Sequence, residues 1–210
     1  MKVQVVILCG GEGTRVQHIT GDTPKCIYPI NGRPFMLYQL EHLKKYSDKI
    51  DSYIISCSDK YEKVYKALLN FNSNIYWNIE NKPFGTLVGL TSAADFIHTD
   101  WVVVLNGDTF CPVDLDKLLE NPKAAITVLC HGNENSGVWL IKAGLLRYMW
   151  HMLEQNIDLW NETIVREVAL APLELRLFKA RYSINYVQGP SFIDMGTPTG
   201  IEQAEKELCP

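Results

Sequence analysis

The chain has 210 residues, of which 47 % are hydrophobic and 21 % are charged, and its formal net charge at pH 7 is −4. This length suits one well-buried domain and is short for two, so we expect a single domain over residues 1–210. The composition is that of a globular protein and excludes a largely disordered chain. The negative charge argues against a protein that binds nucleic acid irrespective of its sequence, because such proteins need a basic face. It does not exclude a nucleotide, which a metal ion and two or three local cations can hold.

The six cysteines form neither a CxxC pair nor a regular pattern. Most of them lie in or beside apolar runs, where cysteine behaves as a small hydrophobic residue, so we expect reduced cysteines with a structural role. The N-terminus lacks a basic segment followed by a long apolar core, and no stretch approaches about 18 apolar residues. We therefore expect a soluble cytoplasmic protein whose partners are neither nucleic acids nor membranes.

Apolar runs that predict strands alternate with segments of helical periodicity over the first two thirds of the chain. The predicted strands are 2–8, 51–56, 74–78, 101–106, 123–130 and 137–141, and the predicted helices between them are 34–46, 59–70 and 85–97. Strands that are apolar almost throughout and alternate with helices are typical of a largely parallel sheet that is covered on both faces. We expect an α/β fold with a mostly parallel mixed sheet flanked by helices.

The C-terminal third is expected to be largely helical. The periodicity predicts an amphipathic helix over 143–154, a helical segment over 161–179 with a break at Pro172, and a strand over 180–187. A last helix is expected to begin at Thr197-Pro198 and to run to about residue 207, with Thr197 as its cap. Neither a repeat nor a linker divides the chain, which agrees with a single domain that has a helical C-terminal portion.

The stretch VVILCGGEGTR, residues 5–15, leads from a predicted strand directly into three glycines and an arginine. Ligands of α/β sheets bind beyond the carboxyl ends of the strands, and glycines let backbone N–H groups point at phosphate oxygens. The loop contains neither GxxxxGK[ST] nor a complete GxGxxG. It therefore predicts an anion site of another type, with a tight strand exit as the alternative.

The continuation of this loop resembles the opening of the sugar-1-phosphate nucleotidyltransferases, which carry GGxGTRL, then PK, then NGKP before a helix. The matching residues are Gly10, Gly11, Gly13, Thr14, Arg15, Pro24, Lys25, Asn31, Gly32 and Pro34. Three later stretches agree with the same family: ENKPFGT (80–86), VVVLNGDTF (102–110) and FIDMGTP (192–198). Among its members, the chain looks most similar to the guanylyltransferases for D-glycero-D-manno-heptose 1-phosphate and mannose 1-phosphate. The residues themselves do not select guanine over the other bases.

The resemblance implies attack by a sugar-1-phosphate oxygen on the α-phosphorus of a nucleoside triphosphate, with release of pyrophosphate. It implies catalytic roles for Arg15, Lys25, Asp108 and Asp194, and Mg²⁺ as a cofactor held by Asp108 and Asp194. Asn135 and Gly137 would face the sugar. The nucleotide would be held by Leu8, Gly10, Gly11, Gly13, Thr14, Arg15, Pro83, Gly85, Thr86 and Gly107. The partners would be a nucleoside triphosphate and a sugar 1-phosphate.

The chain departs from the family between Asp108 and Asn135, where it lacks the Glu-Lys pair and the hairpin that normally cover the sugar. In PFGTLVGL, the bulky Leu87 and Val88 also replace small residues that normally approach the nucleotide. In one interpretation the protein is an active enzyme in which another cation, from Lys142, Lys179, Arg181 or a neighbouring subunit of a homo-oligomer, replaces the missing lysine.

Two alternatives remain open. The protein is a catalytically degenerate regulatory protein that binds a nucleotide or a sugar nucleotide, or it is a cytidylyltransferase for a small phosphate such as phosphocholine. The joint presence of Arg15, Lys25, Asp108 and Asp194 favours the enzyme, because a protein that only binds has little need of both acids.

Overall fold

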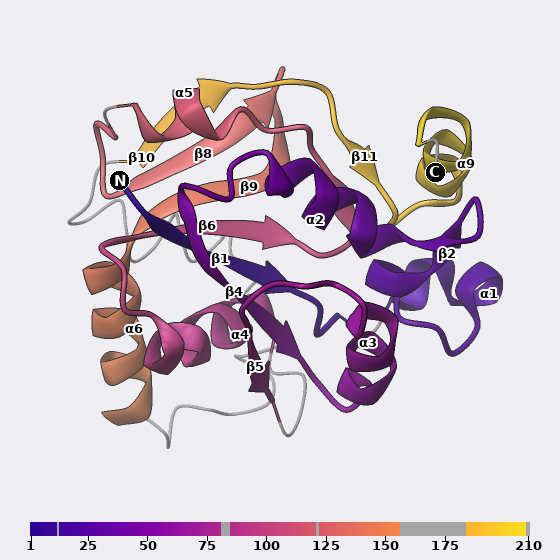
Figure 1. Ribbon diagram of the computed structural model, residues 1–210, viewed down its shortest axis with the longest axis horizontal. Coiled ribbons are helices and arrows are strands. Elements are labelled where there is room, and N and C mark those ends of the chain that lie inside the picture. Colours follow the sequence, from indigo (N-terminus) through magenta and orange to yellow (C-terminus); the bar gives the residue numbers. More distant parts are fainter. Residues whose placement is uncertain (12, 81–84, 121, 156–183, 209–210) are drawn as a thin grey trace.

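A seven-stranded sheet forms the centre of the molecule (Figure 1). The computed structural model describes residues 1–11, 13–80, 85–120, 122–155 and 184–208. Neighbouring strands follow the order β10-β8-β9-β6-β1-β4-β5, and β9 alone runs antiparallel to its two neighbours within this sheet. The strands are β1 (Val3–Leu8), β4 (Ile50–Cys57), β5 (Ile75–Ile79), β6 (Trp101–Asn106), β8 (Ile126–His131), β9 (Glu134–Lys142) and β10 (Ile184–Gln188). The expected α/β fold with a mostly parallel mixed sheet is confirmed.

Helices cover both faces of the sheet because successive strand residues point to opposite sides. Val5 and Ile7 of β1 belong to one buried cluster, which includes residues of α2 (Phe35–Lys44), α3 (Tyr61–Leu68) and α5 (Leu115–Leu119). Val6, which lies between them, belongs to a second cluster with α4 (Thr86–Ser92) and α6 (Ala143–Gln155). The strands therefore lie between two apolar layers, so a polar functional site is expected at an end of the sheet rather than on one of its faces.

A third apolar cluster joins the N-terminal loop region to the C-terminal helix α9 (Pro198–Glu207). It includes residues from two small antiparallel pairs, β2 (Pro29–Ile30) with β3 (Arg33–Pro34) and β7 (Thr109–Phe110) with β11 (Ile193–Asp194). Asn31, in the turn between β2 and β3, donates from Nδ2 to the carbonyls of Glu205 and Leu208 at 2.9 and 2.7 Å. These contacts hold the C-terminal segment against residues 16–38, at the end of the sheet where β1 and β6 terminate (Figure 1).

Most predicted elements are present with shifted ends. The segment predicted as one helix over 85–97 divides into α4 and a 3₁₀ turn at Ala93–Phe96. Thr197 caps α9 as predicted, since its Oγ1 accepts from the N–H of Gly200 at 3.0 Å. The predicted helical segment 161–179, including the break at Pro172, lies outside the described residues, and the predicted strand 180–187 is described from Ile184 onward as β10.

The described cysteines are free thiols, as expected. Within the part of the chain that the structure describes, no helix has the length and apolar character needed to cross a membrane.

Candidate active site

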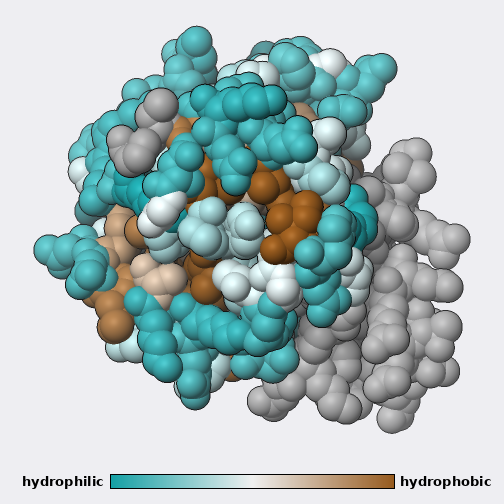
Figure 2. All heavy atoms as spheres, turned by 90° about the vertical axis from the view of Figure 1, so that its right-hand side faces the viewer, coloured by the Kyte–Doolittle hydropathy of each residue, from teal (hydrophilic) through white to brown (hydrophobic). Residues whose placement is uncertain are grey.

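A pocket of about 550 Å³ lies at the carboxyl ends of β1, β4 and β6. The loop that follows β1 lines it with Gly10, Gly11, Gly13, Thr14 and Arg15. The other lining residues are Leu8, Cys9, Lys25, Cys26, Ser56, Glu80, Gly85, Thr86, Gly89, Asn106 and Asp108. Figure 2 shows this end of the molecule, where mostly hydrophilic side chains surround a paler and more hydrophobic centre.

The glycine loop is open to this pocket and does not pack into the core, as the sequence predicts for an anion site. Thr14 and Arg15 are exposed, and Gly10 is half-buried. Gly13 has a φ of 70°, and a Cβ there would lie 3.3 Å from Cγ of Lys25, so only glycine fits without strain. The loop thus presents its backbone beside two cations, Arg15 and Lys25, which is a favourable place for phosphate oxygens.

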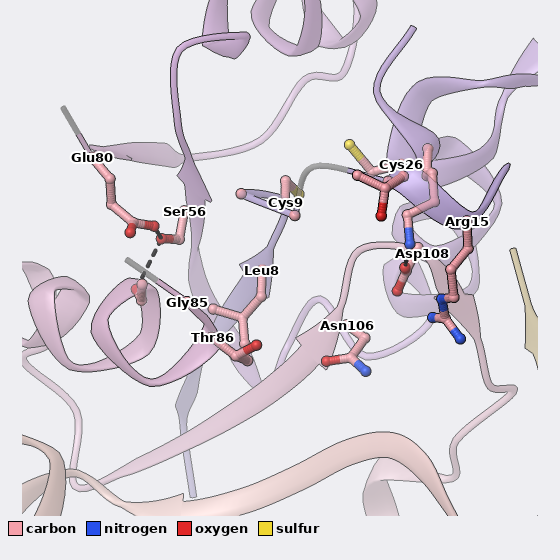
Figure 3. A pocket seen from close by; sticks show the side chains of 16 residues that line it. Leu8, Cys9, Arg15, Cys26, Ser56, Glu80, Gly85, Thr86, Asn106 and Asp108 are labelled. Carbon is pink, nitrogen blue, oxygen red and sulfur yellow. Dashed lines mark hydrogen bonds and ion pairs between the residues drawn. The ribbon is translucent and has the colours of Figure 1, made fainter. Parts of the chain in front are cut away.

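Lys25 forms an ion pair with Asp108 in this pocket (Figure 3). Lys25 begins a 3₁₀ turn over Lys25–Ile27, and Asp108 lies in the turn between β6 and β7. Their side chains are 12 % and 27 % exposed, so the pair is largely withdrawn from water. Both charges lie beside the glycine loop, where a bound phosphate chain would meet them.

Asp194 lies next to this pair through the antiparallel contact of β7 with β11. Asp194 is opposite Thr109, and the N–H of Met195 donates to the carbonyl of Asp108 at 2.8 Å. Oδ1 of Asp194 accepts from the N–H of Gly196 at 2.7 Å. A Cβ on Gly196 would meet Nη2 of Arg15 at 2.7 Å and Oδ1 of Asp194 at 2.9 Å, so arginine and acid lie on the same side of this glycine.

The donor set fits a magnesium ion. Mg²⁺ is usually bound by one or two carboxylates together with substrate phosphates and water. Asp108, in the turn before β7, and Asp194, at the end of the paired strand β11, supply two carboxylates as hard oxygen donors. Among the described residues, no group of three or more His, Cys, Asp and Glu side chains is placed to hold a metal by itself. A metal at these acids would therefore depend on phosphate oxygens from a bound nucleotide.

The remaining predicted residues lie at the wall and the edge of the pocket. Gly85 and Thr86 line it at the start of α4, whereas Gly107 is buried beneath it and Pro83 lies outside the described residues. Asn135 is exposed, and its Oδ1 accepts from the N–H of Gly137 at 2.9 Å.

Gly137 connects this edge to the pocket. Its φ is 71°, and a Cβ on it would lie 3.0 Å from Nδ2 of Asn106, a residue that lines the pocket. The predicted sugar residues therefore adjoin the pocket beside β6 without lining it.

Two expectations are wrong. Lys142 cannot replace the missing lysine, because it pairs with Trp101 at the opposite end of β6 from Asn106. Val88 is buried and does not line the pocket, where the neighbouring Gly89 takes that place. The other candidate cations, Lys179 and Arg181, lie outside the described residues, as does the side chain of Leu87.

The sequence analysis also missed lining residues. Ser56 lies at the end of β4 and Glu80 directly after β5, and Oγ of Ser56 donates to Oε1 of Glu80 at 3.3 Å and to the carbonyl of Gly89 at 2.8 Å (Figure 3). Their position at the carboxyl ends of predicted strands was the available signal. Glu80 opens the matching stretch ENKPFGT but was assigned no role, and Ser56 lies in no matching motif.

Known proteins resemble the chain over most of its length. The D-glycero-alpha-D-manno-heptose 1-phosphate guanylyltransferase of Campylobacter jejuni is 37 % identical over 134 residues, which cover 63 % of this chain and 59 % of that enzyme. The enzyme of the same name from Aneurinibacillus thermoaerophilus is 25 % identical over 98 % of both chains. The crystal structure of HddC from Yersinia pseudotuberculosis complexed with GMP-PN superposes with a TM-score of 0.76 at 22 % identity, over 98 % of this chain and 99 % of that one.

The family assignment rests on a longer match. Residues 5–171 match the model of the MobA-like NTP transferase domain, which is more than half of the chain and includes the glycine loop, Lys25 and Asp108. The chain therefore belongs to the MobA-like NTP transferase family and is a nucleotidyltransferase.

Proposed function

We propose that the protein transfers GMP from GTP to a sugar 1-phosphate of the heptose or mannose type and releases pyrophosphate. The observation that carries this proposal is the pocket that joins the glycine loop to the Lys25–Asp108 ion pair at the carboxyl ends of β1 and β6. The choice of guanine and of the sugar is supported by the names of the two heptose 1-phosphate guanylyltransferases.

The reaction requires charge neutralisation and in-line positioning rather than a general base. The second pKa of a phosphate monoester is about 6, so the sugar phosphate is already a dianion at neutral pH. In the proposal, backbone N–H groups of Gly10, Gly11, Gly13 and Thr14, together with Arg15, hold the β- and γ-phosphates. Arg15 neutralises the charge that gathers on the departing pyrophosphate.

Lys25 and the two acids act at the reacting phosphorus. Lys25 is a compact cation at the pocket wall, so it can exchange its contact with Asp108 for one with the α-phosphate. Asp108 and Asp194 would hold Mg²⁺, which when bound supplies charge neutralisation on the phosphate oxygens. Leu8, Pro83, Gly85 and Thr86 would contact the nucleoside above the buried Gly107, and Asn135 and Gly137 the sugar.

The test is pyrophosphate release from GTP, ATP, UTP, CTP and dTTP in the presence of Mg²⁺. The acceptors are heptose 1-phosphate, mannose 1-phosphate and phosphocholine. We expect release from GTP with one of the sugar phosphates. Release from CTP with phosphocholine would contradict the proposal and show that the protein is a cytidylyltransferase for a small phosphate. Binding of a nucleotide without pyrophosphate release for any acceptor would contradict the proposal and favour the catalytically degenerate regulatory protein.

Lys25 is tested with a matched pair of variants. Lys25→Ala should lower kcat by about 100-fold or more, since it removes a preorganised charge at the reacting group. Lys142→Ala, which removes a lysine at the other end of the sheet, should leave kcat unchanged.

A further inference from the structure

Gln39 of α2 lies beneath the turn that carries Asp108. It is 4 % exposed. Its Nε2 donates to the carbonyl of Asn106 at 2.8 Å and also to the carbonyl of Thr109. These carbonyls belong to the first and last residues of the four-residue turn from β6 to β7. One amide group therefore spans both ends of the turn that aims Asp108 into the pocket.

The same turn is fixed from two other sides by backbone contacts. The N–H of Gly107 donates to the carbonyl of Leu8 at 2.9 Å, and the N–H of Met195 donates to the carbonyl of Asp108 at 2.8 Å. The first bond ties the turn to β1 and the second ties it to β11, which carries Asp194. Gln39 adds a side-chain contact from α2 on the third side, so three elements together determine where the Asp108 carboxylate lies.

The stability of the helix does not explain a glutamine at this place. Gln39 lies three residues after Met36 and four before Leu43, which are both buried in the apolar face of α2. Within the described part of the chain, its Oε1 is buried and has no hydrogen-bond partner. A buried polar atom without a partner is rare and costs free energy, whereas an apolar side chain would avoid the cost. The two hydrogen bonds donated by Nε2 are the interactions of Gln39 that an apolar side chain could not supply.

Farther from the pocket, His42 of α2 and Tyr46 just after its end also form hydrogen bonds to a backbone carbonyl. Nε2 of His42 bonds to the carbonyl of Val113 at 2.8 Å, and the hydroxyl of Tyr46 donates to the same carbonyl at 3.3 Å. Gln39 and His42 follow one another at helical spacing along one side of α2, and Tyr46 lies in the turn just after the helix. Of these three, Gln39 is the residue that reaches the turn of Asp108.

We propose that Gln39 is a positioning residue, which holds the turn 106–109 so that the Asp108 carboxylate lies where it can share a divalent ion with Asp194. This inference rests on the proposed function, because it assumes that the two acids bind the ion together with the nucleotide. Gln39 itself touches neither the ion nor the substrate. Its loss should therefore change ion binding and turnover more than it changes binding of the nucleotide.

The test compares Gln39→Met with Gln4→Met. Gln4 is a buried glutamine at the amino end of β1, where its Nε2 donates to Oγ of Ser52 and to the carbonyl of Phe96 at 3.0 Å each. Both variants remove a buried amide with two donated bonds, but only one of them lies below the pocket. Mn²⁺ serves as the probe, and its binding is followed by the electron paramagnetic resonance signal of free Mn²⁺ in the presence of a non-hydrolysable GTP analogue.

We expect Gln39→Met to weaken Mn²⁺ binding and to lower kcat by about tenfold or more, as for other residues that orient metal ligands. The KM for GTP should stay within about twofold, because the glycine loop is untouched. Gln4→Met should lower Tm while leaving Mn²⁺ binding and kcat unchanged. If Gln39→Met folds poorly, Gln39→Glu is the second variant, because it keeps the shape of the side chain. It replaces the amide donor by a carboxylate oxygen, which faces the two carbonyls as a further acceptor, so it should give the same loss of Mn²⁺ binding.

An effect of Gln39→Met and Gln39→Glu on Tm alone, as for Gln4→Met, would overturn the positioning role. Asp108→Asn separates this outcome from a failure of the proposed function. If Asp108→Asn leaves Mn²⁺ binding and turnover intact, the assignment of the acids is wrong. If Asp108→Asn abolishes both and the Gln39 variants do not affect them, only the inference about Gln39 fails.

Discussion

Asp194 is paired with Thr109 across the short antiparallel strands β11 and β7, which places it beside Asp108 although the two acids are far apart in the sequence. The contact depends on the C-terminal segment, because Ile193, Met195 and Ile201 pack in one cluster with Val16 and Phe35. The packing of helix α9 therefore contributes to the fold and also sets the position of Asp194.

Replacement of Asp194 by Asn should abolish Mg²⁺-dependent turnover and leave the fold intact. Asn keeps the oxygen that accepts from the N–H of Gly196 at 2.7 Å, so Tm should change little. It removes the negative charge that a magnesium ion needs, and we expect kcat to fall by about 100-fold or more. Pyrophosphate release and thermal unfolding are measured together. Asp51→Asn, at the amino end of β4 and paired with His98, is the control and should keep full activity.

The pH dependence of stability should include a contribution from His42. Burial lowers the pKa of its imidazole below the ordinary value, although the hydrogen bond to the carbonyl of Val113 opposes the shift in part. The unfolded chain takes up a proton near pH 6.5, and folded His42 does so only at lower pH. Its contribution is therefore fully present above about pH 6.5 and is lost as the pH falls through the folded pKa.

Urea unfolding at pH 7.5 and pH 5.5 measures this contribution. His42→Gln should make the free energy of unfolding less dependent on pH than it is in the unmodified chain. Tyr46→Phe removes the other side-chain bond to the carbonyl of Val113 without removing an imidazole, so it should lower stability equally at both pH values. A pH dependence of His42→Gln that equals that of the unmodified chain would contradict the assignment.

The sequence predicted the strands and the glycine loop because both have strong local signals. The run 101–106 is short, rich in valine and followed by a glycine, which favours a strand over a helix, and three glycines within four residues mark a loop. The pairing of β7 with β11 had no such signal, since strands of two residues show no periodicity. The juxtaposition of Asp108 and Asp194 was expected only through resemblance to a family.

The failed expectation for Lys142 has a different cause. The strand over 137–141 was predicted, but its direction was not, and an antiparallel strand carries its last residue to the end of the sheet opposite the pocket. Gln39 had no predicted role, because the segment 34–46 was used only to predict a helix with one apolar face. A polar residue within that apolar face was the signal, and only the position of the turn at Asn106–Thr109 shows what it contacts.

Gly107 should tolerate no side chain. A Cβ there would lie 2.7 Å from Sγ of Cys9 and 2.8 Å from the carbonyl oxygen of Leu8, and the latter is backbone that cannot easily move. Gly107→Ala should therefore destabilise the protein by about 1–3 kcal/mol and displace the turn of Asp108. Gly144→Ala is the control, because nothing lies within 4 Å of its added Cβ in α6 and alanine favours helix. Equal Tm values for the two variants would show that the turn can relax.

The sugar phosphate should bind more weakly than the nucleotide. The nucleotide side has a formed pocket that contains the half-buried Lys25, whereas Asn135 on the sugar side is exposed and does not line that pocket. The sequence between Asp108 and Asn135 also lacks the Glu-Lys pair. The described residues there form β7, α5 and β8, and β8 reaches β9 through a short turn at Gly132. Charge interactions weaken where water enters, because the effective dielectric constant rises.

Steady-state kinetics test this difference directly. We expect the KM for the sugar phosphate to exceed the KM for GTP by about tenfold or more, with slow turnover, since weaker binding of one substrate appears in its own KM. Measurement over a range of protein concentrations shows whether a second copy of the chain completes the site, because turnover per subunit would then rise with concentration. A low KM for the sugar phosphate and fast turnover in an isolated monomer would show that residues of the same chain already replace the missing lysine.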